Sequence, residues 1–371
     1  MIRGEGTADK WKVLVYDAHC ADIVAPTVRV GELRACNVTL WLRLEQERQA
    51  VPDAPAVYFV APSEENVRRI ARDLQQGLYS EHHINFCGAL PERQLEELAL
   101  ASVEAGRVAS VQTLQSRHLD FVALEADLFS LNIADSYVLF NDEAIEEAAA
   151  ARFIGQMVEG LLSVVSTLGR VPVIRCNAAS HVSKMVAQAL CARVAAALER
   201  GELADAAGGG GGRLLLVVDD RNTDVAAAVH HCPNYQALVH DCLPFALNRV
   251  TLPPAPAERE GSKAAAAAAH YDLDSASDAF WRANREQGWA EIGPAVKRAV
   301  ESWQRENEQV LALQVKVRER EEKVFSCLFF TISLSPPSSG RRVAGAAGSQ
   351  GRGADGSGGA DGAGDRGQAG S

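Results

Sequence analysis

The chain has 371 residues, of which 47% are hydrophobic and 23% are charged, and its formal net charge is −11. This composition is typical of a globular protein with a large core and about two or three domains. The negative charge, without a basic stripe or aromatic residues interleaved with Lys and Arg, argues against nucleic-acid binding. The N-terminus has no apolar signal-peptide core, and we find no run of about 18 apolar residues, so we expect no direct membrane insertion.

The cysteine spacing predicts free thiols. The eight cysteines include no C-x-x-C pair, and most of them lie in apolar runs. Disulfides are rare in reducing compartments, and free cysteines are often buried. We therefore expect a cytosolic protein whose cysteines are reduced and buried.

Short apolar runs alternate with helical patterns in the first part of the chain. Ser63 is a favourable helix N-cap, and Glu64 and Glu65 suit the positive end of the helix dipole, so a helix is predicted over residues 63–78. Pro91 is expected to begin a further helical stretch, one helix or two, that extends to Gln115. The runs that predict strands are residues 11–17, 38–44, 55–62 and 84–90.

The second part of the chain repeats this alternation. Strands are predicted over residues 171–176 and 213–219, and helices over 142–169, 181–201 and 234–250. Strands that alternate with helices are typical of a parallel sheet. The predicted fold class is therefore α/β, with two open, mostly parallel α/β sheet domains followed by the start of a helical domain and a disordered C-terminal tail.

The composition changes after residue 251. A linker-like stretch is followed by a charged helical pattern, and the last residues are rich in Gly, Ala, Ser and Arg, which predicts disorder. We expect a first α/β domain over 8–135, a second, incomplete α/β domain over 136–251, the start of a helical domain over 252–323, and a disordered tail over 324–371.

The stretch 217–241 concentrates acidic residues and histidines in a way that suggests an active site or a metal site. The candidate metal ligands are His230, His231, Cys232 and His240. They lack the paired spacing of zinc ligands, and adjacent side chains on a helix point apart. The chain also has no nucleophile elbow and no phosphate-binding loop. We therefore expect no catalytic residue, no metal and no other cofactor.

A structural role for the same stretch is the simpler interpretation. Arg221 is expected to form a buried or half-buried ion pair with Asp219, Asp220 or Asp224 at the end of an apolar strand. Ligands of α/β proteins also bind at the carboxyl ends of strands. An α/β enzyme with a ligand site near residues 219–224 therefore stays open as an alternative.

The segment "LLLVVDDRNTDVAAAVHHCPNYQALVHDCLPFALNRV" closely resembles the central segment of the SM (Sec/Munc) family. The stretches "WKVLVYD", "PAVYFVAPSEENVRRI" and "VSTLGRVPVIRC" resemble the Sly branch of that family, and the resemblance covers about residues 11–322. The positions that match the family motif are Asp219, Asp220, Arg221, Asp224, Tyr235, Gln236 and Asp241.

The resemblance implies a non-catalytic regulator of vesicle docking and membrane fusion. SM proteins bind syntaxins and SNARE bundles, and the Sly branch serves transport between the endoplasmic reticulum and the Golgi. A cytoplasmic protein recruited peripherally to these membranes through SNAREs is therefore expected. Family chains are usually much longer, with three domains forming an arch, so a C-terminally truncated member is expected, and a non-functional fragment is the remaining alternative.

The resemblance also implies a peptide-binding groove on the first domain. In Sly-type members this domain holds the N-terminal peptide of a syntaxin, which requires an apolar groove with a charged rim. The matching region is residues 91–115 with the segment "LDFVALEADLFSLN" that follows. Leu95, Leu98 and Val111 are the apolar candidates and Glu125 is the candidate rim charge, although each of them could equally be a core residue.

Overall fold

The computed structural model describes residues 10–142, 144–203, 214–253 and 269–308. The chain divides into two compact units, Met1–Val300 and Glu301–Ser371. The tail predicted over 324–371 lies outside the described residues. In the second unit, residues 301–308 are helical.

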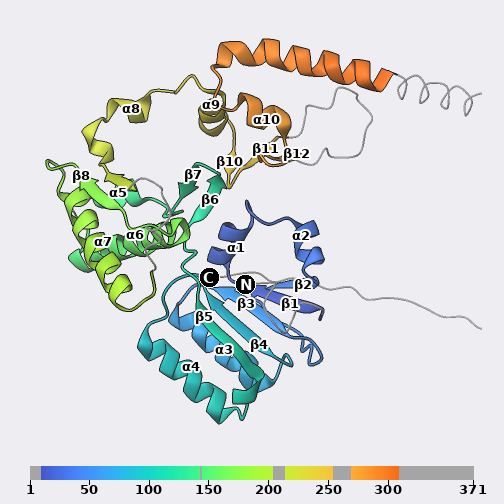
Figure 1. The fold of residues 1–371 in the computed structure, drawn as a ribbon, viewed down its shortest axis with the longest axis vertical. Coiled ribbons are helices and arrows are strands. Elements are labelled where there is room, and N and C mark those ends of the chain that lie inside the picture. The colour runs from blue at the N-terminus through green and yellow to red at the C-terminus, as the bar shows by residue number, and fades with distance from the viewer. Residues whose placement is uncertain (1–9, 143, 204–213, 254–268, 309–371) are drawn as a thin grey trace, which may run out of the picture. The chain divides into compact units, whose positions relative to one another are not determined.

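The first part of the chain forms a five-stranded parallel sheet with the order β2-β1-β3-β4-β5 (Figure 1). Its strands are β1 (Lys12–Tyr16), β2 (Val38–Arg43), β3 (Ala56–Val60), β4 (His82–Phe86) and β5 (Val111–Ser116). The strand order reverses between β1 and β3, because β2 lies on one side of β1 and all later strands lie on the other. Such a reversal is the point at which open α/β sheets bind ligands.

Helices cover both faces of this sheet. They are α1 (Ala18–Val24), α2 (Val30–Ala35), α3 (Glu64–Gln76) and α4 (Glu92–Glu104), and a short 3-10 turn, η1 (Val108–Ser110), precedes β5. Successive residues of β1 point to opposite faces, so Val13 packs with the α3 and α4 residues whereas Leu14 packs with α2. Ser63 caps α3 as predicted, since its side chain accepts a hydrogen bond from the Asn66 amide.

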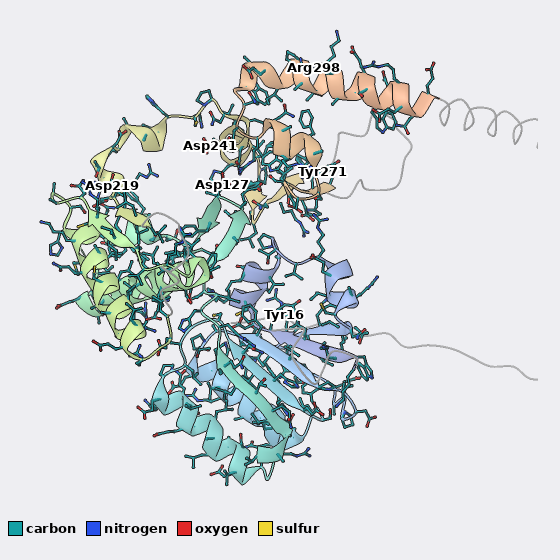
Figure 2. The ribbon with its side chains drawn as sticks, viewed as in Figure 1. Tyr16, Asp127, Asp219, Asp241, Tyr271 and Arg298 are labelled. Atoms are coloured by element: carbon teal, nitrogen blue, oxygen red, sulfur yellow. The ribbon has the colours of Figure 1, made fainter. Side chains whose placement is uncertain are left out.

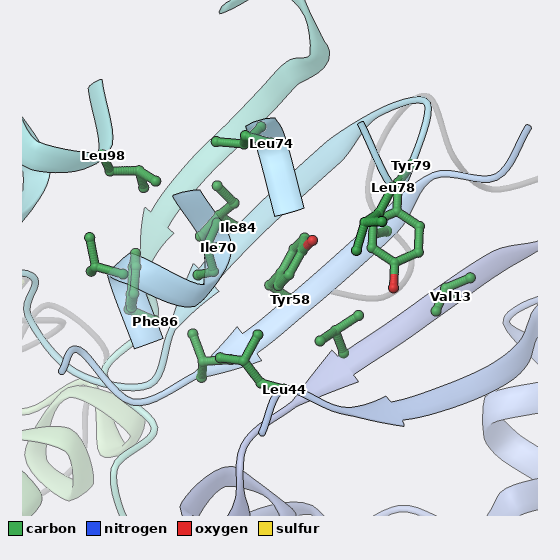
Figure 3. Close-up of a cluster of buried hydrophobic side chains, with 14 of the residues drawn as sticks. Val13, Leu44, Tyr58, Ile70, Leu74, Leu78, Tyr79, Ile84, Phe86 and Leu98 are labelled. Carbon is green, nitrogen blue, oxygen red and sulfur yellow. The ribbon is translucent and has the colours of Figure 1, made fainter. Parts of the chain in front are cut away.

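The largest core lies between the sheet and the α3–α4 pair (Figure 3). Its members come from every layer, and all are less than a tenth exposed. They include Val13, Leu44, Tyr58, Ile70, Leu74, Leu78, Tyr79, Ile84, Phe86 and Leu98. Each large apolar side chain removed from water contributes roughly 1.5–3 kcal/mol, so this cluster supplies most of the stability of the first sheet.

A second cluster forms around two long helices. After the hairpin β6 (Val122–Glu125) and β7 (Leu128–Ser130), the chain forms α5 (Ser136–Phe140), α6 (Glu147–Leu168), β8 (Val173–Cys176), α7 (His181–Glu199) and β9 (Leu215–Val218). β8 and β9 pair in parallel, and one face of the pair packs against α6 and α7. By length and composition alone α6 could cross a membrane, but its Ile154, Val158, Leu162 and Val165 are buried in this core.

The last described part of the first unit is a small mixed layer. It contains the 3-10 turn η2 (Arg221–Thr223), α8 (Ala226–Val229), α9 (Tyr235–Cys242), β10 (Phe245–Ala246), β11 (Arg249–Leu252), β12 (Ala269–Asp272) and α10 (Ala279–Asn284). β10, β11 and β12 form an antiparallel sheet, and residues 289–300 are helical. Trp281 is the centre of a small core with Val239 and Val250.

The α/β fold class is confirmed, but two predicted helices were wrong at their ends. The stretch from Pro91 ends as a helix at Glu104 and then forms β5, because Gly106 adopts a left-handed conformation that interrupts the helix. The helix predicted over 234–250 ends at Cys242, where Pro244 would remove a helical hydrogen bond, and the rest forms β10 and the start of β11.

Candidate functional site

The outward face of α4 carries apolar side chains that nothing in the first unit covers among the described residues. Leu100 is 63% exposed and Val103 is 64% exposed, and both lie on the same side of the helix because they are three residues apart. Leu95 is 42% exposed on the same helix, and Val108 is 56% exposed on η1, which follows it. A helix with an exposed apolar stripe is typical of a surface that binds another polypeptide.

Charged residues border this stripe. Leu100 lines a shallow hollow of about 430 Å³ together with Arg68 and Arg72 of α3 and Glu97 and Glu104 of α4. The Arg68 guanidinium lies 3.1 Å from a Glu64 carboxylate oxygen and 4.0 Å from one of Glu97. The hollow therefore offers both signs of charge beside an apolar anchor position.

The structure separates the four residues predicted for the peptide groove. Leu95 is on the exposed face of α4, as a groove residue must be. Leu98 is a correction: it is only 1% exposed and packs in the main core, because it lies on the inward face of α4. Val111 is half-buried on β5 and packs against the same core. Glu125 is half-buried at the end of β6, where it accepts a hydrogen bond of 2.8 Å from the Trp281 indole N–H.

The ion pair predicted for Arg221 is not formed. Arg221 is exposed, and within the described part of the chain it makes no salt bridge to Asp219, Asp220 or Asp224. The carboxylates accept hydrogen bonds from neutral hydroxyl, amide and backbone N–H groups instead. This prediction was therefore wrong about the partner of the aspartates.

Asp219, labelled in Figure 2, braces the corner after β9 together with Asp220. The Asp219 carboxylate accepts hydrogen bonds from the Asp220 backbone N–H, the Asn177 amide and the Thr223 hydroxyl, and the first of these is the main cause that lowers the pKa of Asp219. Asp220 accepts from the Ser180 hydroxyl at 2.7 Å and from the Asn222 backbone N–H. These bonds give Oδ1 of Asp219 and both carboxylate oxygens of Asp220 structural roles.

The corner also borders a cavity of about 670 Å³ whose walls include Met157, Leu161, Val182 and Val186. Asp219, Asp220 and Arg221 line its rim. The polar rim has the position that the alternative ligand site requires. The Ser183 hydroxyl, which has no hydrogen-bond partner among the described residues, lines the same cavity. The hydrogen bonds that Asp219 and Asp220 accept nevertheless favour a structural corner over a catalytic centre.

The remaining motif residues lie on α9. Tyr235 is half-buried and packs edge-on against Trp281, with ring centroids 5.4 Å apart. The Gln236 side-chain oxygen accepts a bond from Arg285. Asp241 accepts bonds from His231 and His240, and the His231 bond is the main cause that lowers the pKa of Asp241. His231 and His240 are thus held by a carboxylate.

A second group of chemically active side chains was missed at the sequence level. At the carboxyl edge of the first sheet, the His19 Nε2 atom lies 2.6 Å from the Asp120 carboxylate, and the Cys87 thiol lies 3.8 Å from the same oxygen. The hydrogen bond to Asp120 raises the pKa of His19 to about 10. The only signal in the sequence was that His19 follows the strand predicted over 11–17, whereas Cys87 falls inside the strand predicted over 84–90.

Two buried thiols meet at this edge. Cys20 and Cys87 are both fully buried and belong to the same apolar cluster. Burial raises the pKa of Cys20 strongly, whereas the Cys20 thiol lowers that of Cys87. Cys20 and Cys87 are buried, as expected. The expectation is wrong for four other cysteines, which are exposed: Cys176, Cys191, Cys232 and Cys242.

The profile of the Sec1 family matches residues 12–319, which is most of the chain. The chain belongs to the Sec1 family. Relatives named for SLY1 match the chain over more than three quarters of its length. They confirm the resemblance to the SM family and its Sly branch that the sequence predicted.

Three comparisons describe the likeness. The "SEC1 family transport protein SLY1" of Oryza sativa subsp. japonica is 38% identical over 307 residues, which cover 81% of this chain and 46% of the relative. The "Sec1 family domain-containing protein 1" of Homo sapiens is 37% identical over 323 residues, covering 82% and 49%. A crystal structure of Sly1p in complex with an N-terminal peptide of Sed5p has a TM-score of 0.70 and 29% identity, covering 81% and 47%. The Sec1-family chain thus spans about half the length of these relatives.

Proposed function

We propose that this Sec1-family chain binds the N-terminal peptide of a syntaxin-type SNARE on the outward face of α4. The observation that carries the proposal is the exposed apolar stripe of Leu95, Leu100 and Val103, which adjoins the charged hollow between α3 and α4. A short peptide with one apolar anchor and flanking polar groups fits such a surface, because the anchor supplies most of the binding free energy and the charges set its orientation.

The likeness to Sly1p supports this choice of partner. Sly1p was solved with an N-terminal peptide of Sed5p, and the structural match covers 81% of this chain. The chain described here contains the complete five-stranded sheet with α3 and α4. We therefore expect the chain to bind a peptide whose contacts are confined to this sheet and its helices.

The broader role that we propose is a non-catalytic regulator of vesicle docking and fusion between the endoplasmic reticulum and the Golgi. In that role the chain is recruited peripherally to these membranes through its syntaxin partner and engages assembling SNARE helices. The aspartates after β9 support a binding protein over an enzyme, since Oδ1 of Asp219 and both carboxylate oxygens of Asp220 accept hydrogen bonds within the fold.

Calorimetric titration of the whole chain with N-terminal peptides of endoplasmic reticulum and Golgi syntaxins tests the proposal. Leu100→Lys should weaken binding by about 2 kcal/mol or more if Leu100 is an anchor position. The matched control is Val229→Lys, a lysine placed on another side chain that is 77% exposed and lies on α8. Circular dichroism confirms that both variants are folded.

Two results would contradict this assignment in different ways. The absence of binding to every syntaxin peptide, with a folded chain, removes the function. Binding that survives lysine at Leu95, Leu100 and Val103 alike keeps the function and places the groove elsewhere. Leu98→Lys is not informative, because a charge in the main core unfolds the sheet whatever its surface binds.

A further inference from the structure

The carboxyl edge of the first sheet gathers three metal-binding side chains from three parts of the chain. His19 lies on α1, directly after β1, and Cys87 directly follows β4. Asp120 comes from the segment after β5. This edge is next to the point where the strand order reverses between β1 and β3, which is where open α/β sheets bind their ligands.

The ligating atoms are already close together. Those of His19, Cys87 and Asp120 all lie within 4.8 Å of one another. In a tetrahedral zinc site with bonds of 2.0–2.3 Å, neighbouring ligand atoms are roughly 3.3–3.8 Å apart. The Cys87–Asp120 distance of 3.8 Å fits that spacing as it stands, and the His19–Asp120 contact of 2.6 Å has to open by about 1 Å.

We propose that this cluster is a zinc site, with His19, Cys87 and Asp120 as ligands and the fourth position open to solvent. An imidazole, a thiol and a carboxylate suit zinc, whereas Mg²⁺ and Ca²⁺ require oxygen ligands. The assignment departs from the expectation that the chain has no metal. The proposed site also lies outside the histidine-rich stretch 230–240, which contains the metal-ligand candidates considered from the sequence.

The surroundings hold the start of α1, which carries His19, in place. The Asp17 carboxylate accepts hydrogen bonds from the Cys20 backbone N–H at 2.8 Å, from the Ala61 N–H and from the Asn66 amide, so the start of α1 is tied to β3 and α3. Outer hydrogen bonds of this kind orient metal ligands. The site is reached from one side, since the His19 side chain is 41% exposed and a cavity of about 620 Å³ is lined by His19, Gly88 and Asp120.

Zinc has to displace protons to bind here. Without metal, His19 and Asp120 form an ion pair. Metal binding replaces the imidazole proton and the Cys87 thiol proton, which are released to solvent. If the His19–Asp120 ion pair served only to fasten α1, the chain would bind no zinc and release no protons. The number of zinc ions bound per chain therefore distinguishes a metal site from a structural ion pair.

The test uses the whole chain, stripped of metal with a chelator and dialysed against ZnCl₂. We expect about one zinc per chain by elemental analysis, and with Co²⁺ a thiolate-to-cobalt absorption band. Cys87→Ser should abolish that band and Asp120→Asn should weaken zinc binding at least roughly tenfold. Asp120→Asn is included because it preserves side-chain shape at a partly exposed position, so a folding failure of the Cys87 variant does not decide the result.

Matched controls are available outside the cluster. Cys191→Ser removes an exposed thiol of α7, and His231→Ala with His240→Ala removes the two imidazoles that contact Asp241. These variants should keep the zinc and the band. A wild-type chain that takes up no stoichiometric zinc, or zinc that survives Asp120→Asn and Cys87→Ser but is lost in the controls, would overturn the assignment.

Discussion

The Arg48–Asp73 pair is the most deeply buried ion pair among the described residues. The two side chains are 5% and 4% exposed, and the Arg48 guanidinium donates to both Asp73 oxygens at 2.6 and 2.8 Å. The Asp73 carboxylate also accepts from the Tyr58 hydroxyl. Burial raises the pKa of Asp73 and Arg48 opposes that rise, so the charged form of Asp73 depends on its partner.

Arg48→Ala should therefore destabilise the chain by about 3–5 kcal/mol, because it leaves a buried carboxylate unpaired. It also removes the donor to the backbone carbonyls of Arg43 and Leu44, which order the segment after β2. The free energy of unfolding, measured with urea, checks the prediction.

The control for this substitution is Arg249→Ala. Arg249 pairs with Asp272 at 2.6 Å, but both side chains are more than half exposed, so the loss should stay below about 1 kcal/mol. Equal losses in the two variants would show that burial is not what makes the Arg48 pair important.

Single elements of the fold were more predictable than their assembly. Strands β1 to β4 of the first sheet and the Ser63 cap could be predicted, because local apolar runs and capping residues specify them. β5 could not, since Val111 and Leu114 are three residues apart and fit a helix as well as a strand. The cluster of His19 and Asp120 was hidden because the two residues are 101 positions apart and only the sheet topology joins them.

The C-terminus of α3 illustrates how one glycine fixes the end of an element. Gly77 has a left-handed conformation with φ of 64°, and its N–H and that of Leu78 bond to carbonyls of the last turn. A Cβ at this position would collide with the Arg107 guanidinium. Gly169, at the end of α6, has almost the same φ of 62° but open space around it.

Gly77→Ala and Gly169→Ala should each cost roughly 1–2 kcal/mol, because both place a side chain in the left-handed region. The Gly77 variant should cost more, since it also displaces Arg107. Combining it with Arg107→Ala should remove the difference, which thermal or urea unfolding can measure. A smaller loss of unfolding free energy in Gly77→Ala than in Gly169→Ala would contradict the predicted collision with Arg107.

At the scale of the whole molecule, the β8–β9 pair leaves an apolar face uncovered by described residues. One side, with Ile174, Leu216 and Val218, packs on α6 and α7. On the other side Leu215 is 51% exposed and Val217 is 62% exposed. Parallel strands are normally covered on both faces, so a bare one is unusual.

We expect this face to make the chain self-associate, because an exposed apolar sheet surface is stabilised when another surface covers it. The double variant Leu215→Lys and Val217→Lys should weaken association at least tenfold, equivalent to about 1.4 kcal/mol, without lowering the free energy of unfolding, since neither side chain packs in the core. Analytical ultracentrifugation over a range of concentrations measures the effect, and Val229→Lys controls for the added charge at an exposed position on α8. Sedimentation that is the same for the wild type and the double variant would show that the β8–β9 face does not drive association.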